Sequence, residues 1–222
     1  MDQTPAHEQH NPDLLSLIPP HAGTVVEVGC SSGALAREYK KINPNCRYIG
    51  IEVMPQYVPL ARRHCDTVFD LDIECADEEY IRASLPGDCW VFGDSLEHLR
   101  DPWAVLGKVR RTMTALGSVV ACIPNAQHWS VQARLNCGAF RYEDSGLLDR
   151  THLRWFTRIT MIEMFLHAGF RIDAAFPRIF NHPDTDKVLP SIKQMARDIG
   201  ADPEQAAIDA LPLQYVLRAR PG

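Results

Sequence analysis

The sequence lacks the features that would assign it to several protein classes. Its seven cysteines include no CxxC pair, which excludes a zinc ribbon and a thioredoxin-like redox motif. Apolar runs such as residues 119–123 are far shorter than the roughly 20 residues of a membrane-spanning helix. Residues 1–13 contain neither a basic stretch nor an apolar one. We therefore expect no secretory signal, no membrane span and a cytoplasmic location.

Positive charge is scarce as well. The chain has 23 Lys and Arg against 28 Asp and Glu, a net charge of −5, and no basic stripe, so we expect no nucleic-acid partner. What is present is ordinary: 222 residues, 45% hydrophobic and 23% charged. This composition excludes an intrinsically disordered chain and predicts a single domain over residues 1–222. The cysteines are expected to be reduced, and the oligomeric state is not readable from the sequence.

Apolar runs and helical patterns alternate along the first half of the chain. Strands are expected at 24–28, 47–53, 67–71, 88–93 and 118–123, and helices at 12–18, 32–41, 55–64, 77–84 and 102–114. This alternation predicts an α/β fold with a doubly wound, mostly parallel sheet. A helix at 160–168 and strands at 170–176 and 213–219 complete seven strands, the last two as an antiparallel edge pair. Residues 125–150 have poor periodicity, and residues 181–210 are expected to form a polar, partly helical insertion.

The most distinctive local feature is the loop after the first strand, Glu27-Val28-Gly29-Cys30-Ser31-Ser32-Gly33. Such a turn lets backbone N–H groups approach a ligand at a helix N-terminus. Ser31 occupies the second glycine position of the dinucleotide-binding pattern GxGxxG, so that pattern is not matched. The same residues spell G-x-S-x-G, which would make Ser31 the nucleophile of an α/β serine hydrolase. The loop's place after the first strand disfavours the hydrolase, because that nucleophile normally follows several strands.

The loop also reads Glu-x-Gly-x-x-x-Gly and resembles motif I of class I S-adenosylmethionine-dependent methyltransferases. Further motifs of that family follow in the same order, and the resemblance covers roughly residues 12–180. They are Glu52 at the end of the second strand, Asp72-Ile73 after the third, Gly93-Asp94-Ser95-Leu96-Glu97-His98-Leu99 after the fourth, and Ile123-Pro124-Asn125 at the end of the fifth. Residues 146–157 resemble a block of one subfamily, which is often associated with glycan and polysaccharide biosynthesis.

The resemblance implies a Rossmann-like sheet that binds S-adenosylmethionine. Glu52 is expected to accept hydrogen bonds from the ribose hydroxyls, and Asp72 to contact the adenine amino group. The full set of expected cofactor-binding residues is Glu27, Gly29, Ser31, Gly33, Glu52, Val53, Asp72, Ile73, Gly93, Asp94, Ser95 and His98. Ser31 departs from the family, which more often has glycine there. Residues 12–125 would form the cofactor half, and the acceptor-side insertions would lie at about 125–157 and 181–210.

Three residues are expected to be catalytic. His128 follows the fifth strand and His152 lies in the 146–157 block, and histidine can accept a proton near neutral pH. Asp149 is expected to orient or charge-stabilise a neighbouring histidine. The predicted reaction is O-methylation of a sugar or another small hydroxylated acceptor.

No Cys/His/Asp cluster calls for a required metal, although Asp94, Glu97 and His98 could bind one in principle. Two alternatives stay open: the serine hydrolase that uses Ser31, and a non-catalytic scaffold protein that has the cofactor-binding fold.

Overall fold

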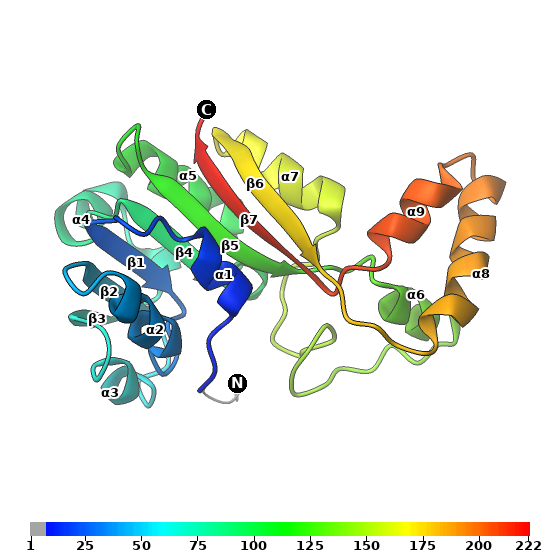
Figure 1. The fold of residues 1–222 in the computed structure, drawn as a ribbon, viewed down its shortest axis with the longest axis horizontal. Helices are drawn as coiled ribbons and strands as arrows, with labels where there is room; N and C mark the ends of the chain where they lie inside the picture. Colours follow the sequence, from blue (N-terminus) through cyan, green and yellow to red (C-terminus); the bar gives the residue numbers. More distant parts are fainter. Residues whose placement is uncertain (1–7) are drawn as a thin grey trace.

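A mixed seven-stranded sheet forms the centre of the computed structural model, which describes residues 8–222. The strand order is β3-β2-β1-β4-β5-β7-β6 (Figure 1). Their bounds are β1 Thr24–Val28, β2 Arg47–Glu52, β3 Thr67–Asp70, β4 Cys89–Gly93, β5 Ser118–Pro124, β6 Phe170–Arg178 and β7 Gln214–Pro221. The first five run parallel, and β7 is antiparallel to both β5 and β6. The predicted sheet with an antiparallel edge pair is therefore confirmed.

Helices cover both faces of the sheet because its central strands are apolar on both sides. On one face α1 (Pro12–Leu17), α2 (Ala34–Ile42) and α3 (Val58–Ala61) share a core with Val25 and Tyr48. On the other face α4 (Glu78–Ser84), α5 (Pro102–Thr112) and α7 (Arg158–His167) share a core with Trp90 and Phe92. Two 3₁₀ turns, η1 (Ile73–Cys75) and η2 (Leu96–His98), follow β3 and β4. The carboxyl ends of the parallel strands are thereby left as the open edge of the sheet, where ligands bind in such folds.

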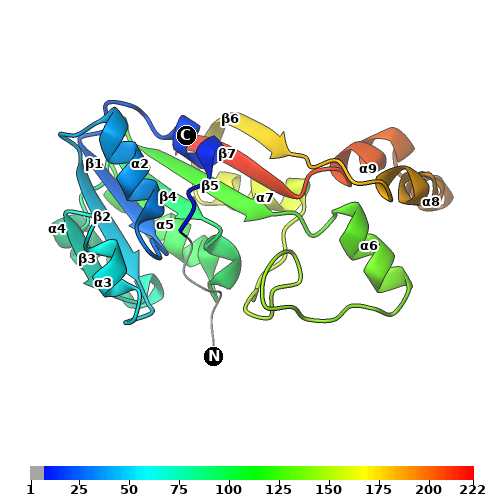
Figure 2. The same ribbon diagram turned by 60° about the horizontal axis from the view of Figure 1, so that its bottom comes forward.

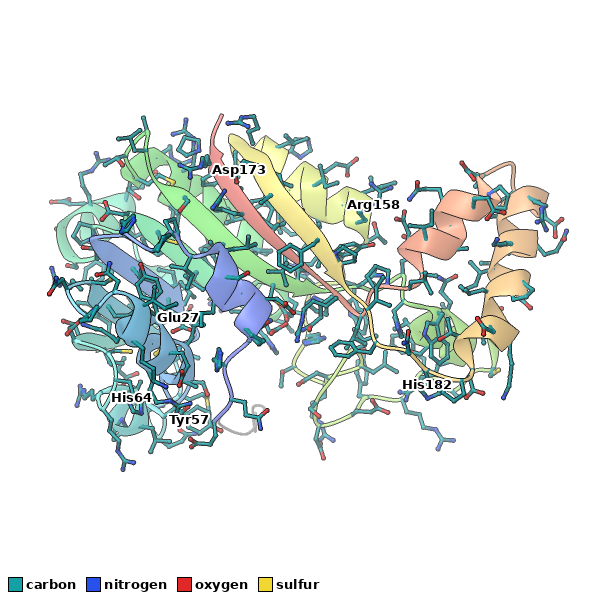
Figure 3. The ribbon with its side chains drawn as sticks, viewed as in Figure 1. Glu27, Tyr57, His64, Arg158, Asp173 and His182 are labelled. Atoms are coloured by element: carbon teal, nitrogen blue, oxygen red, sulfur yellow. The ribbon has the colours of Figure 1, made fainter. Side chains whose placement is uncertain are left out.

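Three further helices gather beyond the β6–β7 end of the sheet (Figures 1 and 2). These are α6 (Trp129–Asn136), α8 (Thr185–Asp198) and α9 (Pro203–Asp209), and Trp129, Ile192 and Ala210 form their small core. An ion pair of 2.7 Å between Arg158 Nε and Asp209 Oδ1 ties α9 to α7 (Figure 3). Helix α6 is not visible in the sequence pattern of its segment. It buries only Trp129 and Val131, which are too few residues for an apolar stripe.

The remaining composition-based expectations concern the membrane and the cysteines. Within residues 8–222, no helix has both the length and the apolar character that a bilayer crossing requires. All seven cysteines are free thiols, and five of them are buried. The reduced state of the cysteines and the cytoplasmic location both stay predictions.

Gly50 in β2 provides a test of the packing beneath the Gly29 loop. A Cβ atom at this position would lie 2.6 Å from the Sγ atom of Cys30. We expect Gly50→Ala to lower the free energy of unfolding by about 1–3 kcal/mol, because extra volume in a packed core forces its neighbours to move. Adding Cys30→Ala should recover part of that loss. Urea denaturation of both variants measures the free energy of unfolding. A value for Gly50→Ala equal to that of wild type would contradict the prediction.

Candidate functional site

A cavity of about 590 Å³ lies at the carboxyl ends of β1, β2 and β4. A volume of this size is typical of small-molecule sites. The expected cofactor-binding residues line it with one exception, Gly33. The lining members are Glu27, Gly29, Ser31, Glu52, Val53, Asp72, Ile73, Gly93, Asp94, Ser95 and His98. Residues that were expected to act together from four separate motifs therefore surround one space.

The backbone of the loop between β1 and α2 has an unusual conformation. Gly29 and Gly33 have positive φ angles of 75° and 78°, and Ser31 has a φ of 48°. The left-handed region favours glycine, so Ser31 is strained where the resembling family more often has glycine. A Cβ atom on Gly33 would lie 3.2 Å from the backbone of Ala61. Gly33 therefore allows α2 to pack closely on α3 instead of lining the cavity.

The Glu52 carboxylate is fixed at the wall of the cavity. It is 4% exposed. Its Oε2 atom accepts a hydrogen bond of 2.8 Å from the Ser31 backbone N–H, and its Oε1 atom accepts one of 2.9 Å from Met54 N–H. A carboxylate has about four acceptor positions, so it can still accept hydrogen bonds from a ligand. At the cavity edge, Asp72 caps η1 and pairs with Arg100 at 3.0 Å.

Glu27 lies deeper, on β1 (Figure 3). The Tyr48 hydroxyl donates a 3.0 Å hydrogen bond to its Oε2 atom. Burial raises the pKa of Glu27 to about 8, with a smaller contribution from the negative charge of Glu52, and it outweighs the opposing effect of the Tyr48 hydrogen bond. Near neutral pH the Glu27 side chain is therefore mainly a neutral carboxylic acid.

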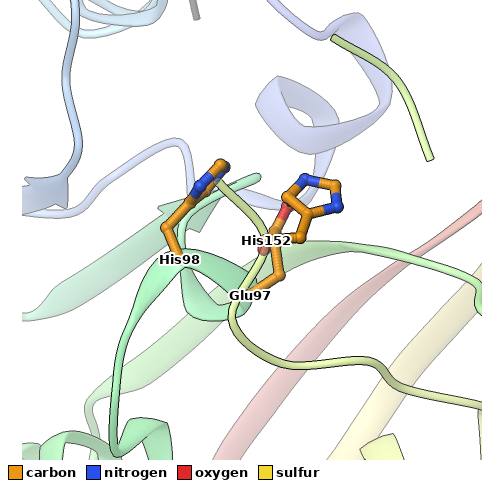
Figure 4. A group of neighbouring side chains, drawn as sticks. All are labelled: Glu97, His98 and His152. Atoms are coloured by element: carbon orange, nitrogen blue, oxygen red, sulfur yellow. The ribbon is translucent and has the colours of Figure 1, made fainter. Parts of the chain in front are cut away.

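Beside the cavity, Glu97, His98 and His152 form a compact group (Figure 4). Glu97 and His98 come from η2, and His152 comes from the loop between α6 and α7. One nitrogen or oxygen atom from each residue lies within 4.8 Å of the others. The Nε2 atom of His152 is 3.9 Å from Glu97 Oε1, and the two imidazole ring centroids are 4.8 Å apart. His98 belongs to this group and also lines the cavity.

Asp149 reaches this group through Thr151. It accepts hydrogen bonds from the Thr151 backbone N–H (2.7 Å) and hydroxyl (2.6 Å). The Thr151 carbonyl and hydroxyl oxygens lie 3.2 and 3.0 Å from His98 Nδ1. Burial, assisted by the nearby His98, lowers the pKa of His152 to about 4 despite the negative charge of Asp149. Asp149 is thus linked to His98 through Thr151, and its negative charge opposes the lowering of the His152 pKa.

His128 lies elsewhere. It caps the N-terminus of α6 and lines a second cavity of about 410 Å³. Its Nδ1 atom is 2.8 Å from the Ser130 hydroxyl, and burial lowers its pKa to about 4. The lining of this cavity is His128, Trp129, Ser130, Ala133, Arg134, Phe180, Asn181, His182 and Leu213. The structure therefore brings His152 and Asp149 together beside the first cavity, but not His128.

Several residues of the first cavity were not expected from the sequence. Gln9, His10 and Asn11 close it from the N-terminal side, and Tyr57 and Arg178 also line it. The Asn11-Pro12 signal predicted the start of α1, and Asn11 does cap that helix. The same pattern does not indicate that Gln9 and His10 line the cavity, because their position depends on where α1 packs.

Comparison with known proteins decides between the alternatives. The family described as "Methyltransferase domain" matches residues 6–175 of the chain. The chain belongs to this methyltransferase family. The predicted enzyme class, an S-adenosylmethionine-dependent methyltransferase, is thereby confirmed, and the serine hydrolase that would use Ser31 is not supported. No curated protein matches the sequence.

Solved structures share the fold of this methyltransferase at low sequence identity. A Listeria monocytogenes protein described as an S-adenosylmethionine-dependent methyltransferase is 13% identical, with a TM-score of 0.62, covering 95% of this chain and 97% of its own. A Thermotoga maritima protein described as a SAM-dependent methyltransferase and possible histamine N-methyltransferase is 15% identical, with a TM-score of 0.61 and coverages of 94% and 86%. The O-methyltransferase from neocarzinostatin biosynthesis, in complex with S-adenosylhomocysteine and 1,4-dihydroxy-2-naphthoic acid, is 12% identical, with a TM-score of 0.55 and coverages of 91% and 50%.

Glu27 gives the site a measurable pH signature. Between its ordinary pKa of 4.5 and its raised pKa of about 8, the unfolded chain ionises this carboxyl while the folded protein keeps it protonated. Folding then takes up a proton, so stability falls by up to about 1.4 kcal/mol per pH unit as pH rises through this range. Glu27→Gln removes that loss while keeping an acceptor for Tyr48.

Urea denaturation should therefore show the stability of Glu27→Gln relative to wild type rising between pH 4.5 and pH 8. Glu79→Gln, on the exposed side of α4, is the matched control and should follow the wild-type curve. Parallel curves for wild type and Glu27→Gln would contradict the assignment of a buried, protonated Glu27.

Proposed function

We propose that this methyltransferase methylates a hydroxyl oxygen of a small acceptor, and that the 590 Å³ cavity holds the cofactor. One observation carries the proposal: His98 lines the cavity and also contacts His152 in the group that contains Glu97. Side chains able to bind and deprotonate a hydroxyl thus adjoin the space for the methyl donor. S-adenosylmethionine, when bound, supplies an electrophilic methyl group.

The cavity residues are suited to that cofactor. Glu52 offers a fixed carboxylate for the two ribose hydroxyls, in the manner of the acidic residue of dinucleotide-binding folds. The left-handed backbone at Gly29 and Ser31 leaves room beside the helix N-terminus. Asp72 and Ile73 also line the cavity, and we propose that the adenine ring binds beside them.

On the acceptor side, we propose that His152 accepts the proton of the hydroxyl. Its Nδ1 atom lies 3.2 Å from the Leu147 carbonyl oxygen, which can only accept a hydrogen bond. Nδ1 therefore carries the proton, and Nε2 presents a lone pair. Asp149 is a positioning residue, because it holds Thr151, which in turn holds His98. A catalytic role for His128 stays a prediction, since its cavity is a different one.

Among hydroxylated acceptors we propose a sugar or glycan. This narrower proposal is supported by the resemblance of residues 146–157 to the glycan-associated subfamily. A labelled-methyl screen of sugars and small phenols, run with the purified protein, would identify the acceptor.

Glu52→Gln tests the cofactor site. Losing hydrogen bonds to a charged carboxylate costs about 1.5–3 kcal/mol, so the Kd for S-adenosylhomocysteine should rise roughly tenfold or more. Isothermal titration calorimetry measures this, and circular dichroism checks that the variant is folded. Glu79→Gln should bind like wild type. Equal affinity of Glu52→Gln and wild type would exclude the proposed ribose contact.

His152→Ala tests the acceptor side. We expect kcat to fall by roughly 10²–10⁴ while the Kd for S-adenosylhomocysteine stays within about twofold of wild type, because His152 is absent from the lining of the cofactor cavity. Methyl transfer to the acceptor found in the screen, together with calorimetry, separates the two effects. A rise in the Kd for S-adenosylhomocysteine as large as the fall in kcat would contradict an acceptor-side role.

A further inference from the structure

We propose that Glu97, His98 and His152 bind a divalent first-row transition-metal ion beside the cofactor cavity. The site would use one carboxylate oxygen and two imidazole nitrogens, with its open positions available to the acceptor. The three ligand atoms converge from two segments that are more than 50 residues apart in the chain. A metal requirement could not be predicted from the sequence, because nothing in it places His152 beside Glu97.

The Glu97 side chain is buried without a hydrogen-bond partner for its carboxyl oxygens among the described residues. The residue is 1% exposed. A buried carboxylate without partners is costly. The charges that act most strongly on it, those of Asp94 and Asp149, are also negative. A bound cation would both pair with the carboxylate and offset this negative potential.

Hydrogen bonds at Nδ1 fix the orientation of both imidazoles. The Thr151 hydroxyl gives its proton to Asp149, so its oxygen can only accept from His98 Nδ1. His98 therefore has its proton on Nδ1 and a lone pair on Nε2. His152 has the same arrangement, because the Leu147 carbonyl accepts from its Nδ1 atom. Metal-binding histidines are characteristically held in this way, by a carbonyl or carboxylate network behind the ring.

The spacing is also suitable. Ligand atoms around one such ion lie about 3.0–3.5 Å apart, given metal–ligand distances of about 2.1 Å. His152 Nε2 and Glu97 Oε1 are separated by 3.9 Å, and all three ligand atoms lie within 4.8 Å. Small side-chain rotations would bring these ligand atoms to the separations of a metal site. At 3.9 Å the two groups are too far apart to hydrogen-bond directly.

The donor set indicates the class of ion. Two imidazoles and one carboxylate suit Zn²⁺, Fe²⁺, Co²⁺ or Mn²⁺, whereas Mg²⁺ and Ca²⁺ prefer oxygen ligands. Three protein ligands leave positions for further ligands, as in catalytic metal sites. The inference rests on the proposed function only for the role of the ion. With the ion bound, the Nε2 lone pair of His152 would be a metal ligand and could not accept the proton proposed above. An acceptor hydroxyl bound to the ion would instead have a lowered pKa and would release its proton to water.

Titration with Co²⁺ tests the site without any acceptor. The protein is first treated with a chelator, and the visible absorption of bound Co²⁺ is then followed. We expect saturation at one equivalent. Glu97→Gln and His152→Asn should each raise the Kd for Co²⁺ at least tenfold, while thermal unfolding confirms that both variants are folded. Glu79→Gln and His167→Asn, at exposed positions on α4 and α7, are the matched controls and should bind like wild type.

Non-saturable binding, or equal affinity of the cluster variants and the controls, would overturn the inference. Calorimetry with S-adenosylhomocysteine on the metal-free protein separates it from the proposed function, because Glu97→Gln should keep cofactor binding. If the methyl screen instead found only nitrogen or carbon acceptors, O-methylation would fail while the Co²⁺ result would stand.

Discussion

The site depends on hydrogen bonds between the loop after β1 and the end of β2. The N–H groups of Gly29 and Cys30 both donate to the Ile51 carbonyl, at 2.9 and 3.1 Å, and the N–H of Ser31 donates to Glu52 Oε2. Three consecutive amides are thus held by one strand end. These contacts offset the cost of the left-handed Ser31 backbone. They also fix the Glu52 carboxylate where a ligand in the cavity can reach it.

A single backbone carbonyl organises the acceptor side in a similar way. The Glu97 carbonyl oxygen accepts hydrogen bonds from the N–H groups of Leu153 and Arg154, at 2.8 and 3.0 Å. The Arg154 guanidinium also donates to the Arg100 carbonyl. The loop that carries His152 is therefore attached to η2, which follows β4. Because η2 also carries His98, the same turn joins the cofactor cavity to the proposed acceptor site.

The parts of the site that follow strands could be predicted from the sequence. Glu52 ends an apolar strand, and Asp94 follows another, so parallel pairing alone brings them to one edge of the sheet. The roles of His128 and His152 could not be separated in this way. Both follow β5 in a region of weak periodicity, and their positions depend on loop contacts between distant residues. The role of Gly33 could not be predicted for a different reason. A glycine of a ligand-binding motif can be required for helix packing instead of ligand contact, and the motif alone does not distinguish the two.

Two buried glutamates in this protein show how differently a carboxyl group can be accommodated. Glu27 receives a hydrogen bond from Tyr48 and becomes a mainly neutral acid near neutral pH, so its burial is compatible with an otherwise apolar strand. For Glu97, burial together with the charges of Asp94 and Asp149 raises the pKa well above its ordinary value. Yet within residues 8–222 neither of its oxygens has a hydrogen-bond partner. The His152 imidazole, with its Nε2 atom 3.9 Å from Glu97 Oε1, lies beside it, and a cation bound between the two groups would replace the proton on Glu97. The arrangement around Glu97 is thus that of a binding site, whereas Glu27 is held as a mainly neutral acid in the wall of the first cavity.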